Sequence, residues 1–92
     1  MANTYYIPTM MHTAGGPLLW YASAHLAAAV TNLFYVESVY PYWHDRDAFF
    51  FENSPQVVNG MVTPPDLPGL GLQFKKGLFD RKDVIVETIA GK

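Results

Sequence analysis

The sequence predicts an α/β fold built on one strand–helix–strand unit. Three observations indicate it. A short run rich in aromatic and β-branched residues occupies positions 5–11, and an almost wholly apolar segment follows at 18–30. A second continuous apolar run then spans positions 33–36 and ends on Glu37. Strand, helix and strand in this order are typical of a βαβ unit, in which the two strands are parallel.

The first strand and the helix are each marked by a proline. Pro8 has no N–H to donate, so that part of the 5–11 strand must be irregular or lie at a sheet edge. Gly15 and Gly16 form a flexible turn, and Pro17 suits the first position of a helix because its missing N–H has no partner there. The helix is apolar nearly all round, which predicts burial on more than one side.

The second strand predicts where functional groups gather. Positions 33–36 are apolar without alternation, as in a strand of a parallel sheet that is buried on both faces. His12 follows the first strand and Glu37 follows the second. Because parallel strands end at the same sheet edge, and sites form at that carboxyl edge, we expect these two side chains to lie together.

The remaining residues predict short, irregular elements. The 39–51 segment is rich in aromatic residues and carries a charged cluster. Asn59-Gly60 between two apolar runs predicts a β-hairpin over 56–63 with a type I′ turn. We expect a loop over 64–69, an extended piece over 70–74, a helical turn within 75–82 and a last strand at 84–89.

Composition limits the classes of function. Of the 92 residues, 50% are hydrophobic and only 15% are charged, which fits one small domain or a segment buried in a larger body. The net charge of −2 and the lack of a basic patch argue against nucleic acid as a partner. No cysteine is present, so disulfides and thiolate metal sites are excluded, and we expect a cytoplasmic protein.

A membrane-associated protein is one alternative. All 14 charged residues lie at or after Glu37, and positions 17–36 form an uncharged stretch long enough to cross a bilayer. Ser23 and His25 interrupt that stretch, and no Lys or Arg precedes it, so we expect no membrane partner.

The two other histidines have simpler interpretations than catalysis. His25 lies in the middle of the predicted helix, where a hydrogen-bonded packing role is expected. His44 lies beside Asp45 and Asp47 with a weak resemblance to metal-ligand spacing, but a solvated loop with local ion pairs explains it.

The order of these motifs resembles a known family. The first motifs are His12 after a predicted strand, the Ala-Ser-Ala-His-Leu-Ala-Ala-Ala sequence at 22–29 in the predicted helix, and Glu37 after the second predicted strand. The downstream sequences Pro-Gln-Val-Val-Asn-Gly-Met-Val-Thr-Pro-Pro (55–65) and Leu-Pro-Gly-Leu-Gly-Leu (67–72) agree with it. Together they resemble the C-terminal portion of the mandelate racemase/muconate lactonizing branch of the enolase superfamily, and acid-sugar dehydratases most closely.

The resemblance implies a place in a larger fold. Residues 1–49 would be the terminal strand–helix–strand segment of a modified (β/α)-barrel. Residues 50–92 would be a C-terminal extension, including the hairpin, that packs on the capping domain.

The resemblance also implies a reaction. The family removes a proton α to a carboxylate with the help of Mg²⁺, forms an enediolate, and in dehydratases loses the β-hydroxyl. His12 matches the family's general base or acid. Glu37 matches a glutamate that hydrogen-bonds the carboxylate of the sugar-acid substrate, for which it must be protonated. His12 and Glu37 are therefore the expected catalytic residues.

The magnesium ligands of the family are missing from this chain. The family holds Mg²⁺ with three carboxylates on earlier strands, and no carboxylate precedes Glu37 here. We therefore assign no metal-binding or cofactor-binding residue and expect the chain to be inactive alone. Its expected partners are the remainder of the enzyme or further copies of itself. A non-catalytic module that acts through oligomerisation or docking is the second alternative.

Overall fold

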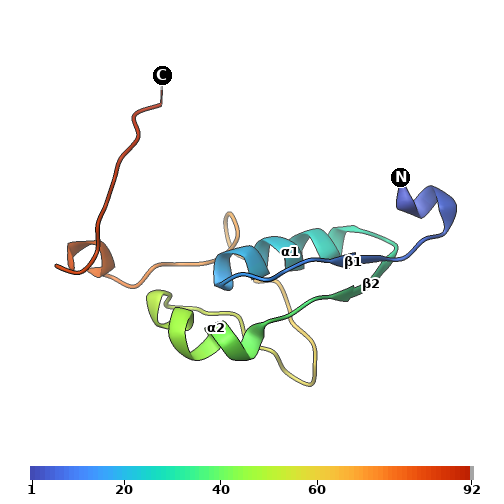
Figure 1. Cartoon of the computed structure of the whole chain (residues 1–92), viewed down its shortest axis with the longest axis horizontal. Coiled ribbons are helices and arrows are strands. Elements are labelled where there is room, and N and C mark those ends of the chain that lie inside the picture. The colour runs from blue at the N-terminus through green and yellow to red at the C-terminus, as the bar shows by residue number, and fades with distance from the viewer. Residues whose placement is uncertain (92) are drawn as a thin grey trace.

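A two-stranded parallel sheet with one helix beside it forms the centre of the molecule (Figure 1). The elements are β1 (Thr9–Met11), α1 (Pro17–Ala29) and β2 (Leu33–Val36). This computed structural model describes residues 1–91. The order and parallel pairing of the elements confirm the predicted α/β class and its strand–helix–strand unit.

The first strand is shorter than predicted. Residues 2–5 form a short 3₁₀ helix, η1 (Ala2–Tyr5), and Tyr6 follows in the left-handed region with φ 56°. The strand begins only after Pro8, since an extended chain cannot pass through that turn. Asn32 then secures the start of β1, because its Nδ2 donates to the Ile7 carbonyl (2.7 Å) and its own carbonyl accepts from the Thr9 N–H (2.8 Å).

Helix α1 buries one face only. Its core residues recur at helical spacing: Trp20, Tyr21, Ala24 and Ala27. Leu18, Leu19 and Leu26 are exposed. The expected burial on more than one side is therefore wrong for this chain, because its described residues supply cover for a single face.

Strand β2 is exposed, which corrects a second expectation. Phe34 and Tyr35 keep 62% and 63% of their surface accessible, and Leu33 is also exposed. A strand is buried on both faces only when layers of structure cover both. The two-stranded sheet has α1 beside it and leaves much of β2 uncovered (Figure 1).

A second helix, α2 (Tyr40–Asp47), was not predicted from the sequence. Pro41 lies in its first turn, where a missing N–H costs nothing. Trp43 is buried and packs against Trp20 of α1, with ring centroids 6.2 Å apart. A short 3₁₀ helix, η2 (Ala48–Phe50), continues from it. These contacts hold α2 against the centre of the molecule.

Asp47 brings the end of α2 to the beginning of α1. A Cβ atom at Gly16 would lie 3.3 Å from Asp47 Oδ2, so the glycine permits this close approach. Arg46 donates from Nε to Asp47 Oδ1 at 2.5 Å, and this hydrogen bond lowers the pKa of Asp47. An ionised carboxylate beside the first turn of a helix is favourable.

The hairpin predicted at 56–63 forms only as a tight turn. Asn59 and Gly60 both have positive φ, 51° and 72°, as a type I′ turn requires. Val58 and Met61 exchange two backbone hydrogen bonds of 2.9 Å, and the pairing stops there. The predicted turn is confirmed, whereas the predicted pair of strands is wrong.

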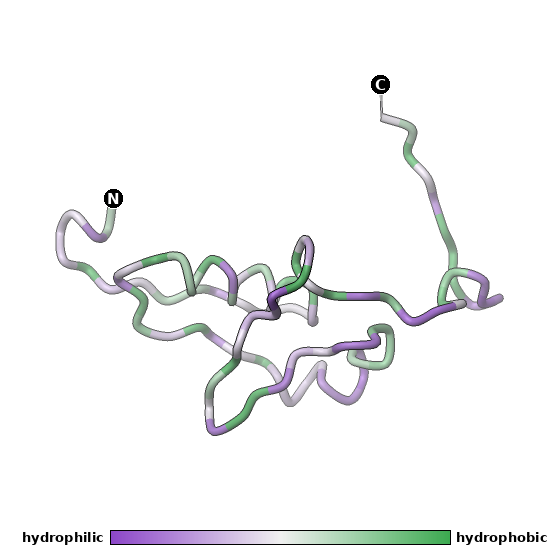
Figure 2. The backbone as a smooth tube through the Cα atoms, turned by 180° about the vertical axis from the view of Figure 1, so that it is seen from behind, coloured by the Kyte–Doolittle hydropathy of each residue, from purple (hydrophilic) through white to green (hydrophobic). Residues whose placement is uncertain are grey.

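The C-terminal residues contain little regular structure. Phe74, in the predicted extended piece, bridges Phe51, and a 3₁₀ helix, η3 (Leu78–Asp80), lies within the predicted helical turn. The strand predicted at 84–89 is wrong: this segment has no partner strand among residues 1–91 and leads away from the rest of the molecule (Figure 1). Figure 2 shows hydrophobic positions along this segment, and Ile85 and Ile89 are exposed.

The uncharged stretch at 17–36 divides into α1, a turn and β2. Within residues 1–91, no helix has the length and apolar character needed to cross a bilayer.

Candidate active site

The register of the two strands places His12 beside Glu37. Thr9 pairs with Leu33, but Met10 pairs with Tyr35 and Met11 with Val36, so Phe34 is an extra residue in β2. Without this bulge, His12 would face Val36. With it, the residues that follow Met11 and Val36 leave the sheet together, and the Glu37 N–H donates to the Met11 carbonyl at 3.0 Å.

The two predicted site residues are in direct contact. His12 Nδ1 lies 2.6 Å from Glu37 Oε2. The His12 side chain is 84% exposed and that of Glu37 is 38% exposed. The structure therefore brings together the imidazole and the carboxyl expected at the carboxyl edge of the sheet, and their catalytic roles stay a prediction.

Thr13 is a third member of the site, and sequence analysis missed it. Its backbone N–H donates to Glu37 Oε2 at 3.0 Å, and its Oγ1 donates to the Met11 carbonyl at 3.4 Å. The residue is fully buried. Its place directly after His12 was the available signal, but a backbone donor leaves no mark in the residue type.

This arrangement is suited to proton transfer. A histidine that is held through one ring nitrogen by a carboxylate has its ring fixed and its other nitrogen available. Imidazole exchanges protons near neutral pH more readily than any other ordinary side chain. The high exposure of His12 leaves room for a reacting molecule on the open side of the ring.

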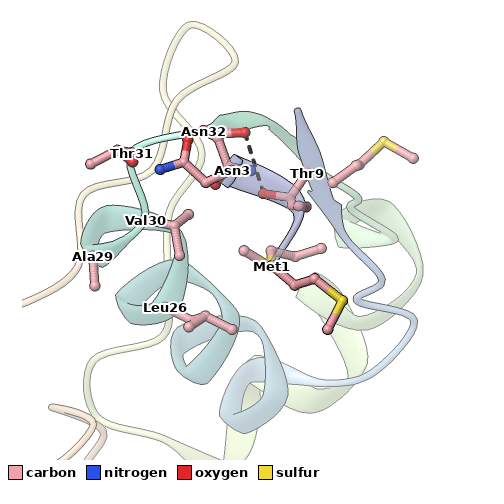
Figure 3. A pocket seen from close by; sticks show the side chains of 11 residues that line it. Met1, Asn3, Thr9, Leu26, Ala29, Val30, Thr31 and Asn32 are labelled. Carbon is pink, nitrogen blue, oxygen red and sulfur yellow. Dashed lines mark hydrogen bonds between the residues drawn. The ribbon is translucent and has the colours of Figure 1, made fainter. Parts of the chain in front are cut away.

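One cavity is lined by neither His12 nor Glu37. It measures about 540 Å³ and is lined by residues from η1, β1 and the end of α1, including Met1, Asn3, Leu26 and Thr31 (Figure 3). The Thr9 Oγ1 hydrogen bond to the Asn32 carbonyl crosses one side of it. No acidic, basic or histidine side chain lines this cavity, so it offers no side chain for acid–base chemistry.

The other two histidines lie outside the site. His25 Nε2 is 3.3 Å from the Leu70 carbonyl, which fits the expected hydrogen-bonded packing role. His44 Nδ1 is 3.1 Å from Asp45 Oδ1, as expected for a local ion pair, although this pair lies on α2 and not on a loop.

The residues present do not fit a magnesium site. Mg²⁺ requires near-octahedral oxygen coordination, usually with more than one carboxylate. In residues 1–91, no three His, Cys, Asp or Glu side chains come together to hold a metal. Glu37 Oε2 already accepts from Thr13 and contacts His12.

Comparisons with known proteins agree on one family. Residues 1–78 match the model of a family described as enolase C-terminal domain-like. A D-xylonate dehydratase from Haloferax volcanii is 37% identical over 92 aligned residues, which cover 97% of this chain and 21% of that protein.

A solved structure supports the same relationship. The crystal structure of an enolase of the mandelate racemase subgroup from Agrobacterium tumefaciens superposes with a TM-score of 0.67 and 27% sequence identity. The match covers 87% of this chain and 21% of that one. The chain thus spans about one fifth of the length of the relatives that it matches.

Proposed function

Because the chain belongs to the enolase C-terminal domain-like family, a part of the enolase superfamily, we propose that it carries the proton-transfer residues of an acid-sugar dehydratase. One observation carries the proposal. His12 and Glu37 meet at 2.6 Å, at the carboxyl ends of two adjacent parallel strands. That is the edge at which barrel enzymes and open α/β sheets place their sites.

In this proposal β1, α1 and β2 are the last strand–helix–strand segment of a modified (β/α)-barrel. The exposed side chains of β2 and the uncovered face of α1 support it, because neighbouring strands and helices would bury them. Residues 1–49 form that barrel segment, and residues 50–92 form the extension that packs on a capping domain.

The proposed reaction begins at the α-carbon of a sugar acid. His12 removes the α-proton, and the electron pair of the broken C–H bond spreads onto the carboxylate oxygens. Glu37, in its protonated form, donates a hydrogen bond to that carboxylate and stabilises the added charge. The protonated His12 then returns its proton to the departing β-hydroxyl, and water leaves. The enol that remains rearranges to a 2-oxo-3-deoxy acid.

The metal of the family must be held by other polypeptide. Residues 1–91 lack a site that fits Mg²⁺, and no step above is assigned to one. We propose that the carboxylate ligands and the walls of the substrate pocket come from the four fifths of the enzyme that this chain does not span. The chain alone is then inactive towards D-xylonate in the presence of Mg²⁺.

A chimera tests the proposal. The matched fifth of the Haloferax volcanii dehydratase is replaced by this chain, and Mg²⁺-dependent formation of 2-oxo acid from D-xylonate is measured. His12→Asn removes the base, and general acid–base catalysis contributes about 10²- to 10⁴-fold, so kcat falls by that factor.

His44→Asn is the matched control, since it removes a half-buried histidine of α2 that lies outside the site. It should leave kcat within about twofold, because it changes no group of the proposed site and substitutions away from such groups usually have small effects. A folded chimera that is inactive with His12 intact, or equally active without it, contradicts the proposal.

A second candidate function is a non-catalytic module that docks on another protein or on its own copies. The exposed aromatic side chains of β2 favour it, because large apolar patches mark interaction surfaces. Size-exclusion chromatography of the purified chain, alone and with a truncated relative that lacks the matched fifth, separates self-association from docking.

A further inference from the structure

The residue after Glu37 joins three parts of the fold through one oxygen atom. Ser38 Oγ accepts a hydrogen bond from Trp20 Nε1 of α1 at 3.2 Å and another from the backbone N–H of Tyr40, the first residue of α2, at 3.1 Å. We propose that Trp20 and Ser38 are positioning residues, which hold Glu37 where it can bind the carboxylate of the substrate. The catalytic meaning of this inference rests on the proposed function.

Glu37 lies in a connection that has no regular structure of its own. Residues 37–39 link β2 to α2 and belong to neither element. On the side of β2, the Glu37 N–H donates to the Met11 carbonyl at 3.0 Å. On the side of α2, the hydrogen bond from Tyr40 to Ser38 Oγ closes a local turn of the kind that serine favours. The backbone of Glu37 is therefore held on both sides.

Trp20 fixes this turn relative to α1. A hydroxyl oxygen has two lone pairs, and the two donors occupy both of them on Ser38. Trp20 is 3% exposed, and its ring packs against that of Trp43, so its indole N–H points in a fixed direction. An indole N–H can only donate, and a buried one needs an acceptor, which Ser38 Oγ supplies.

The same helix follows the loop that carries His12. Residues 13–16 connect His12 to α1, and the Trp20 backbone N–H donates to the Gly16 carbonyl at 3.0 Å in the first turn of that helix. Strand pairing is one connection between the segments that carry the two site residues, and the hydrogen bond from Trp20 to Ser38 is a second. Loss of the second connection should therefore move Glu37 while the strands stay paired.

The backbone N–H of Thr13 reports the position of the Glu37 carboxyl group. It donates to Glu37 Oε2 at 3.0 Å, so it exchanges with deuterium faster when that group moves away. The full chain is exchanged in deuterated water, quenched, and read by NMR in dimethyl sulfoxide, which also dissolves an associated chain. The Thr9 N–H is the control, because it donates to the Asn32 carbonyl at 2.8 Å at the other end of β1.

Substitutions of Ser38 test the acceptor. Ser38→Ala removes the hydroxyl group, and we expect the Thr13 N–H to exchange about 3- to 10-fold faster, which corresponds to the loss of one hydrogen bond. Ser38→Thr keeps the hydroxyl group and should restore the wild-type rate. The Thr9 rate should stay unchanged in both variants, whereas a general loss of stability would raise both rates.

Substitutions of two tryptophans test the donor. Trp20→Phe removes the indole N–H and keeps an aromatic ring, so the Thr13 rate should rise as it does in Ser38→Ala. Trp43→Phe is the matched control, because it removes the same atoms from another buried ring whose Nε1 has no hydrogen-bond partner within residues 1–91. It should leave the Thr13 rate unchanged relative to that of Thr9. This pair decides the question if Ser38→Ala does not fold.

Three results would overturn the inference. Glu37→Ala removes the acceptor of the Thr13 N–H, and an unchanged Thr13 rate in that variant would show that the carboxyl group is not bonded there. Unchanged rates in Ser38→Ala and Trp20→Phe, or an equal effect of Trp43→Phe, would show that the hydrogen bond to Ser38 does not position Glu37. A Ser38→Thr variant that behaves like Ser38→Ala would exclude the hydroxyl group as the cause.

Activity is a separate measurement in the chimera. Misplacement of a group that binds the substrate lowers kcat/KM by up to about 10²-fold, so Ser38→Ala should lower kcat/KM and Ser38→Thr should restore it. An active chimera in which Ser38→Ala keeps the wild-type kcat/KM contradicts the inference. An inactive chimera removes the proposed reaction and leaves the result of hydrogen exchange standing.

Discussion

Single residues determine the geometry of the site and of the loop beside α1. Sequence analysis found His12 and Glu37 because their residue types and positions after apolar runs are visible. It missed Thr13, which contributes a backbone N–H that any residue except proline carries. The same limit applies to Gly71, whose importance lies in its backbone angles and in its close neighbour Pro65.

Gly71→Ala is expected to destabilise the loop that contacts α1. Gly71 has φ 77°, and an added Cβ would lie 2.2 Å from Pro65 Cγ, so the substitution combines backbone strain with a steric clash. Its carbonyl also accepts from Asn53 Nδ2. Strain of this kind costs about 1–3 kcal/mol before the clash is added. Urea unfolding followed by circular dichroism measures the loss.

Gly69→Ala is the matched control for this prediction. Gly69 also has positive φ, 65°, but an added Cβ would meet nothing within 4 Å. Gly69→Ala therefore incurs only the cost of the strained backbone, about 1–3 kcal/mol, without a steric clash. Equal losses for the two variants would show that the contact with Pro65 contributes nothing.

At the scale of elements, the parts predicted from sequence are those with a pattern of their own. Pro17 and a long apolar run identify α1, and a short apolar run identifies β2. Helix α2 has no such pattern, because it buries only Trp43 and ends in charged residues. Its position depends on a partner, Trp20, that is distant in sequence.

The bulge in β2 was unpredictable for a similar reason. Register depends on how two strands pair, and Phe34 resembles its neighbours in composition. The sequence therefore predicted that His12 and Glu37 share an edge, but not the shift that brings them into contact. The strand predicted at 84–89 failed because a β-rich pattern needs a partner strand, which the described residues do not supply.

Trp43→Ala is expected to release α2 from α1. Removing a buried tryptophan costs about 3–5 kcal/mol, which is a large part of the stability of a small domain. Tyr42→Ala, on the same helix, removes an exposed aromatic residue and should change stability by less than about 0.5 kcal/mol. Near-ultraviolet circular dichroism and urea unfolding measure both variants.

The packing of Trp43 is supported if Trp43→Ala loses the near-ultraviolet circular dichroism signal of the folded chain while Tyr42→Ala keeps it. Similar behaviour of the two variants would contradict the position of Trp43 in the core.

At the scale of the whole molecule, the chain is more expanded than a self-sufficient domain. Its radius of gyration is 15.7 Å, whereas a compact domain of this length has about 12 Å. Its extents are 51 × 40 × 23 Å, and the C-terminal residues lead away from the centre (Figure 1). A shape with this much exposed surface fits a segment that is completed by other polypeptide.

The isolated chain is expected to self-associate through β2. Unpaired strand edges and exposed apolar side chains favour association. A double variant, Phe34→Glu with Tyr35→Lys, places charges on this strand and should shift the chain towards monomer. Sedimentation velocity measures the change.

Tyr42→Lys charges an even more accessible aromatic position on α2 and should leave the association unchanged. A wild-type chain that is monomeric at all concentrations contradicts this prediction.

The extra residue in β2 has a consequence for how this segment can evolve. Because Phe34 is unpaired, the number of residues between Asn32 and Glu37 sets where the carboxyl group emerges. Substitutions within this stretch do not change the number of residues in it. Deletion or insertion of a single residue would move Glu37 to the opposite side of the strand. We therefore expect this stretch to vary in sequence but not in length.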